Sequence, residues 1–112
     1  MNLSELCEAL SLDVVAGDTA GKTWHGVYAG DLLSRAMSHV KLDNLWITIM
    51  SNTNVIAVAS LTEACAVILA EGVELLPEAL DAAVDNGITV LSSTRTVNEL
   101  CIAIHEASSG RK

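Results

Sequence analysis

The chain has 112 residues, of which 51% are hydrophobic and 18% are charged, and its fourteen acidic and six basic residues give a net charge of -8. This length suits one domain with one core, and the apolar content excludes an intrinsically disordered chain. Binding to nucleic acid or to an anionic membrane surface needs clustered Lys and Arg, which an acidic chain of this kind does not supply. The composition therefore predicts neither nucleic acid nor membrane among the partners.

The N-terminal segment predicts a helix over residues 3–10 followed by a short strand over 12–16. Asn2 and Glu5 have the spacing of a capping box, in which each side chain accepts a hydrogen bond from the other residue's backbone amide. Gly17 then ends the strand, because glycine readily adopts the backbone angles of a turn.

A polar connection over 18–22 leads into a predicted second strand over 24–29, which is rich in aromatic and β-branched residues. The next segment, 32–40, has helical periodicity, and Asp31 is placed to cap the helix. The apolar face of this helix is expected to comprise Leu32, Leu33, Ala36, Met37 and Val40.

Residues 45–50 predict a third strand, and its almost wholly apolar sequence indicates burial on both faces. Residues 53–61 have the composition of a strand, but 65–70 form a better strand shortly afterwards. Two parallel strands need a crossover of about a dozen residues or more. We therefore expect 53–61 to be a short buried helix that connects two parallel strands.

The C-terminal part predicts a helix over 77–86 with Gly87 in the C-terminal cap position, and then a strand over 88–91. A final helix over 96–107 opens with a Thr–Glu capping box. The tail from about residue 108 is expected to be frayed.

The alternation of strands and helices predicts a single α/β domain over 1–112, with a mostly parallel sheet of about five strands flanked by helices. The N-terminus has no basic segment of the kind that opens a signal peptide, and no apolar run is long enough to span a membrane. We expect a cytoplasmic protein.

The segment Gly17 to Thr23 ends in Gly-Lys-Thr, as a phosphate-binding P-loop does. A P-loop needs four residues between its glycines and must open a helix, whereas three residues separate Gly17 from Gly21 and a strand follows. We interpret this segment as a surface turn. A phosphotransfer enzyme is accordingly the least favoured of three functional hypotheses.

The histidines and cysteines are widely spaced and form no pair with metal-ligand spacing. We expect reduced thiols, no metal and no cofactor, with the cysteines acting mainly as small apolar side chains in a reducing compartment. These residues are His25, His39, His105, Cys7, Cys65 and Cys101.

Polar residues and glycines follow the predicted parallel strands, and ligands of open parallel sheets bind at the carboxyl ends of the strands. The alternative is that these residues are ordinary caps and turns. No catalytic acid–base pair can be selected, so the predicted site is a binding site. Its candidate residues are Gly30, Asp31, Asn52, Thr53, Asn54, Gly72, Ser92, Ser93, Thr94 and Arg95.

Three segments, GVYAGDLLSRAMSHV, LWITIMSNTNVIAVASLTEACAVILAEG and NGITVLSSTRTVNEL, resemble the DRTGG-domain family, and in particular its small stand-alone members. The likeness covers roughly residues 10–105, and GDLLS and NVIAVASL are its most specific parts. The five-residue motif that names the family is not present. Some relatives carry a histidine just before the asparagine of the second segment, where this chain has Ser51-Asn52-Thr53.

The resemblance implies a fold like the N-terminal domain of HPr kinase/phosphatase. It also implies a regulatory or dimer-forming module, since such domains accompany CBS pairs in pyrophosphatases and the acyl-transfer domain of long phosphotransacetylases. Some small members are labelled serine kinases, but the phosphate loop of the true kinase lies in a separate domain. Stand-alone members also occur beside hydrogenase and redox genes, which implies a redox or metabolic enzyme as a partner.

The favoured hypothesis is a non-catalytic regulatory or protein-interaction domain that forms a homodimer, and the alternative is a small-ligand or adenine-nucleotide sensor. The segment 53–61 is apolar around its whole circumference, whereas a surface helix has one polar face. We expect a two-fold partner to cover this helix near Val58; the alternative is that the N-terminal helix folds over it.

Overall fold

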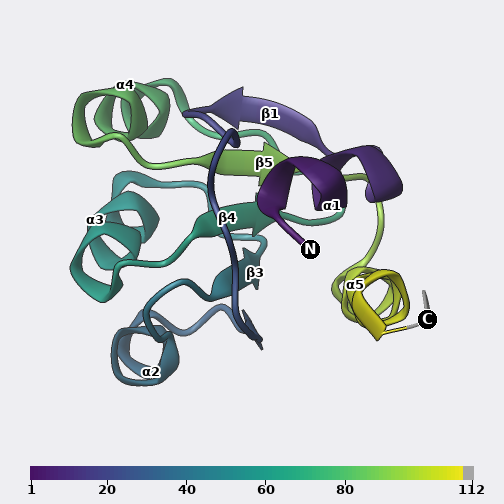
Figure 1. The fold of residues 1–112 in the computed structure, drawn as a ribbon. Helices are drawn as coiled ribbons and strands as arrows, with labels where there is room; N and C mark the ends of the chain where they lie inside the picture. Colours follow the sequence, from purple (N-terminus) through teal and green to yellow (C-terminus); the bar gives the residue numbers. More distant parts are fainter. Residues whose placement is uncertain (110–112) are drawn as a thin grey trace.

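A computed structural model describes residues 1–109 as one sheet between two layers of helices (Figure 1). The five strands are β1 (Asp13–Ala16), β2 (Val27–Ala29), β3 (Leu45–Thr48), β4 (Ala66–Leu69) and β5 (Val90–Ser92). The helices are α1 (Leu3–Leu10), α2 (Leu33–His39), α3 (Thr53–Thr62), α4 (Pro77–Asn86) and α5 (Val97–Ser109).

The strand order in the sheet is β1-β5-β4-β3-β2. Strands β2 to β5 are parallel to one another, and β1 pairs antiparallel with β5 at one edge. Every residue of β3 and β4 is buried, because these central strands have helices on both faces. The predicted α/β fold with a mostly parallel sheet is confirmed.

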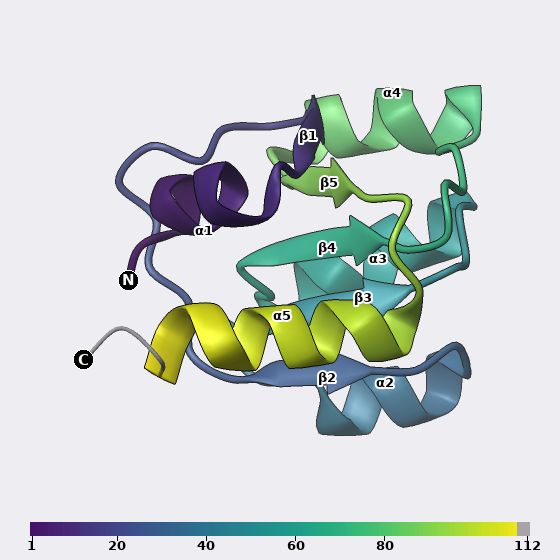
Figure 2. The same cartoon turned by 90° about the vertical axis from the view of Figure 1, so that its right-hand side faces the viewer.

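Helices α1 and α5 cover one face of the sheet, and α2, α3 and α4 cover the other (Figures 1 and 2). The segment predicted as a buried helix, 53–61, is helix α3, and it lies between α2 and α4. This arrangement corrects the expectation about Val58, which is only 4% exposed within one chain. Neighbouring helices of the same layer supply the cover that was expected from a partner or from the N-terminal helix.

Local capping signals are realised as the sequence predicts. Asn2 and Glu5 form the capping box of α1, with both hydrogen bonds at 2.8 Å. Thr96 and Glu99 do the same at the start of α5. Gly87 ends α4 with φ +66°, a left-handed conformation that favours glycine.

Helix α2 departs from its prediction. Its N-cap is Leu32, and no side chain caps it, because the Asp31 carboxylate points instead to the end of β3. Leu32 is 62% exposed and Met37 is 49% exposed, so these two residues do not belong to the buried face. The buried part of the helix is narrower than predicted and centres on Ala36.

Several predicted boundaries also differ: β3 ends at Thr48 instead of residue 50, and β5 covers Val90–Ser92 instead of 88–91. Strand β2 begins at Val27, since the backbone around Gly26, with φ +79°, breaks the extended conformation predicted from residue 24. Helix α5 continues to Ser109, beyond the predicted end. The remainder of the tail that was expected to be frayed, 110–112, lies outside the described residues.

Candidate functional site

The loops that follow β2, β3, β4 and β5 lie together at the carboxyl ends of these parallel strands. We call these loops, with the first turn of α3, the strand-end rim (residues 30–32, 49–54, 70–76 and 92–96). Backbone hydrogen bonds connect the loops: Gly72 donates to Ser93 at 2.9 Å, and Leu76 donates to Ser51 at 3.1 Å. The rim therefore brings together the residues that the sequence predicts as one candidate site.

Asp31 serves the structure of the rim. Its carboxylate accepts hydrogen bonds from the hydroxyl of Thr48 at 2.7 Å and from the amide of Ile49 at 3.0 Å. Gly30, just before it, donates its amide to Ile47 and accepts a hydrogen bond from the indole of Trp46. These contacts attach the loop after β2 to the end of β3.

The Arg95 side chain reaches toward the end of α1 and does not present its charge at the strand-end rim. Its guanidinium donates a hydrogen bond to the carbonyl of Leu10, the last residue of α1, where a positive charge complements the helix dipole. Its backbone amide bonds the hydroxyl oxygen of Ser93 at 3.1 Å. The rim also carries the acidic residues Asp31, Glu71 and Glu74, so it has no concentration of positive charge for a phosphate group.

Two of the helix N-termini at the rim, those of α3 and α5, are capped by side chains, whereas α2 and α4 have no side-chain cap. The Asn52 side chain accepts from the amides of Asn54 and Val55, and Thr96 caps α5. The exposed polar groups that remain at the rim include Thr53, Asn54 and Thr94. These groups can form hydrogen bonds with an uncharged polar ligand, and the acidic side chains of the rim disfavour an anion.

The Gly-Lys-Thr segment lies at the amino ends of the parallel strands, opposite the strand-end rim. Lys22 Nζ donates to the hydroxyl of Thr89 at 2.9 Å, and that hydroxyl donates to the carbonyl of Asp18 at 2.8 Å. Thr89 directly precedes β5, so this contact is at the amino ends of the strands. The segment opens no helix, which agrees with its interpretation as a turn.

The sulfur and imidazole groups do not define a metal centre: within residues 1–109 no group of three or more His, Cys, Asp or Glu side chains could hold a metal ion. Burial raises the pKa of the Cys7 thiol and that of the Cys65 thiol. Both thiols are therefore weaker nucleophiles than a free cysteine at neutral pH.

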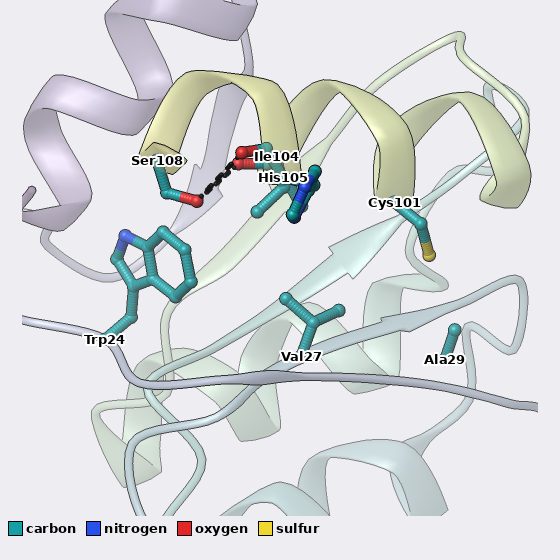
Figure 3. A pocket seen from close by; sticks show the side chains of 7 residues that line it. All are labelled: Trp24, Val27, Ala29, Cys101, Ile104, His105 and Ser108. Atoms are coloured by element: carbon teal, nitrogen blue, oxygen red, sulfur yellow. Dashed lines mark hydrogen bonds between the residues drawn. The ribbon is translucent and has the colours of Figure 1, made fainter. Parts of the chain in front are cut away.

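A pocket of about 310 Å³ lies between β2 and α5, on the face of the sheet that α1 and α5 cover (Figure 3). Val27 and Ala29 point from β2 toward α5, and Trp24 stands at one end. The indole nitrogen of Trp24 is buried without a hydrogen-bond partner among the described residues. The lining residues are Trp24, Val27, Ala29, Cys101, Ile104, His105 and Ser108.

The sequence did not predict this pocket. It depends on β2 being the edge strand and on α5 returning over it, and local pattern reports neither strand order nor helix placement.

A mostly parallel sheet with helices on both faces defines a three-layer α/β domain, and polar residues form a rim at its strand ends. A solved structure with this fold is that of the CBS and DRTGG domains of the regulatory region of Clostridium perfringens pyrophosphatase, in complex with the activator diadenosine tetraphosphate. The TM-score is 0.78 at 16% sequence identity, over 95% of this chain and 46% of that chain.

The chain thus spans about half the length of that regulatory region. The likeness confirms the DRTGG-like fold that the sequence resemblance implies. Comparisons with protein-family models and with curated proteins give no match. Within residues 1–109, every helix falls short of the length and apolar character that crossing a membrane requires.

Proposed function

We propose that the chain is a non-catalytic regulatory domain that acts through contact with other protein chains and forms a homodimer. The observation that carries this proposal is the use of the rim's polar groups inside the domain. Asp31 holds Thr48, Arg95 holds Leu10 and Asn52 caps α3, so the groups that would have to act on a substrate are structural. The likeness to a regulatory region supports the same function.

The test is a turnover assay of the purified protein with ATP and Mg²⁺, together with light scattering over a dilution series. We expect no ATP hydrolysis or phosphotransfer above that of a heat-denatured control, and a mass of two chains. Turnover that co-purifies with the protein and disappears in Lys22→Ala would refute the non-catalytic function. A monomer at every concentration would refute the homodimer.

The second candidate is a sensor of small ligands or adenine nucleotides at the strand-end rim. It is favoured by the activator in the pyrophosphatase regulatory region, diadenosine tetraphosphate. On this chain the rim combines exposed Thr53, Asn54 and Thr94 with the acidic Asp31 and Glu71. We therefore propose that it would contact the adenosine part of such a ligand and leave the phosphates in solvent.

Calorimetric titration with adenosine, AMP, ATP and diadenosine tetraphosphate tests this candidate. Similar affinities for adenosine and ATP, both reduced by Thr94→Ala and unchanged by Ser60→Ala in the exposed last turn of α3, would support it. Binding of ATP but not of adenosine, with loss of binding in Lys22→Ala, would instead place a phosphate site near Lys22, at the amino ends of the strands. A redox or metabolic enzyme remains the proposed protein partner, from the family resemblance.

A further inference from the structure

The two edges of the sheet differ in how they are protected. At one edge, β1 carries the exposed charge of Asp13 and a register shift between Val14 and Ala16. Charges and bulges of this kind prevent an edge strand from pairing with another chain. At the other edge, β2 has the sequence Val27-Tyr28-Ala29, with no charge, no proline and a regular register against β3. The β2 edge lacks the features that would keep it unpaired.

The backbone of β2 presents free hydrogen-bonding groups at this edge. The carbonyl of Gly26 accepts from Leu45 at 3.0 Å, and the amide of Gly30 donates to Ile47 at 3.1 Å. In a parallel ladder these inward bonds alternate with outward groups along the strand. The amides and carbonyls of Val27 and Ala29 therefore point away from the sheet.

An apolar groove runs along the same edge. It is the pocket between β2 and α5, with Val27 and Ala29 on its floor and Cys101 and Ser108 on the helix side (Figure 3). Val27 remains 39% exposed. A strand added to β2 would extend the sheet and close this groove at once.

We propose that the strand that occupies this edge is β2 of a second copy of the chain, paired antiparallel about a two-fold axis near Tyr28. In this register Val27 lies opposite the partner's Ala29, and each such pair exchanges two hydrogen bonds, about four in all. The outward groups match because the axis relates the edge to itself. This proposal rests on the proposed homodimer and identifies its surface.

The helix layer fits the same arrangement. Helix α5 packs over both β2 and β3 (Figure 2). With strands about 4.8 Å apart, the two copies of α5 would lie about 10 Å from each other, close to the usual spacing of packed helices. The small side chains of Cys101 and Ser108 face this contact. The groove would then become the interface between the two α5 helices.

The charges along the edge are compatible with this pairing. The same register brings His25 toward the partner's Asp31, and no like charges fall opposite each other along β2. An edge with this sequence can therefore approach its own copy despite the chain's net negative charge.

The experiment is light scattering on the full chain and on Ala29→Pro, with Leu61→Lys as a control. Proline at position 29 removes only an outward amide, so the sheet within one chain keeps its hydrogen bonds. We expect a wild-type dimer, an Ala29→Pro monomer with native circular dichroism, and a Leu61→Lys dimer. Because Ala29→Pro could fail to fold, Val27→Lys is measured in parallel and is expected to be monomeric.

Hydrogen exchange gives a second readout, since the amide of Ala29 should exchange more slowly as the protein concentration rises. A wild-type dimer that persists in folded Ala29→Pro and Val27→Lys would overturn the β2 surface and leave the proposed homodimer intact. A wild-type monomer would overturn both. Loss of the dimer in Leu61→Lys alone would place the interface on the α3 side of the sheet.

Discussion

The carboxylate of Asp31 accepts a hydrogen bond of 2.7 Å from the hydroxyl of Thr48, a residue with no exposed surface. The same oxygen accepts from the amide of Ile49 at 3.0 Å. A residue in the loop after the edge strand β2 thereby satisfies polar groups at the end of the buried strand β3. A side chain that looked like a helix cap or a ligand contact is part of the sheet's framework.

Replacing Asp31 by alanine should lower the free energy of unfolding by about 1–3 kcal/mol, because the buried hydroxyl and the amide lose their acceptor. Asp31→Asn keeps an acceptor oxygen and should lose less. Urea denaturation of both variants checks this prediction. Equal losses in the two variants would mean that the hydrogen bonds to this oxygen are not what stabilises the rim.

Gly17 and Gly21 allow a matched comparison in one loop. Both have positive φ, +80° and +73°, but a methyl group at Gly17 would lie 2.6 Å from the Cα of Thr89, while nothing lies within 4 Å of one at Gly21. Gly21→Ala should cost about 1 kcal/mol from backbone strain. Gly17→Ala should cost about 1–3 kcal/mol more, because Thr89 must shift. Similar thermal unfolding of the two variants would contradict the close packing of the loop against Thr89.

Val58 and Leu61 test the position of α3 within one chain. Val58 is 4% exposed and Leu61 is 71% exposed on the same helix. Val58→Glu buries a charge without a partner and should cost at least about 3 kcal/mol or prevent folding. Leu61→Glu should stay within about 0.5 kcal/mol of wild type. Native circular dichroism and unchanged urea stability in Val58→Glu would contradict the burial of α3 between α2 and α4.

The thiol of Cys65 should make stability depend on pH. Burial raises its pKa above the ordinary value of 9.0; Lys22 opposes this shift, while Asp43 and Cys7 add to it. The folded state therefore holds the thiol proton more tightly than the unfolded state does. Its contribution to stability is fully present below about pH 8.5 and is lost as the pH rises through the folded pKa.

Urea midpoints measured from pH 7 to pH 10.5 check this dependence. Wild type should be level up to about pH 8.5 and then decline, and Cys65→Ala should decline less steeply. The comparison within one pH series cancels the titration of lysine and tyrosine. Identical pH profiles for the two proteins would rule out Cys65 as a source of the decline.

Much of the fold could be predicted from local sequence because its signals are local. The capping boxes at Asn2 and Thr96 and the C-cap at Gly87 need only residues of the same helix. The assignment of 53–61 as a helix was also correct, since the length of a parallel crossover is a constraint on chain spacing. The grouping of the rim followed from the rule that parallel strands end at the same edge.

The roles of individual rim residues could not be predicted in this way. Arg95 bonds Leu10, and Lys22 bonds Thr89, across long separations in the sequence. Which partner such a side chain finds depends on where the chain returns. Residue type and spacing indicate only that a polar group is present.

The sequence by itself determined the alternation of strands and helices, the caps of α1, α4 and α5 and the burial of β3, because hydrophobic period and capping act over a few residues. Only the tertiary structure decided that β1 is antiparallel and carries a register shift, and that β2 is the other edge strand. It alone also decided that α5 packs over β2 to form the groove. Strand order is set by the packing of two whole helix layers on the sheet. The strand order therefore depends on the packing of the whole chain and cannot be predicted from any single segment.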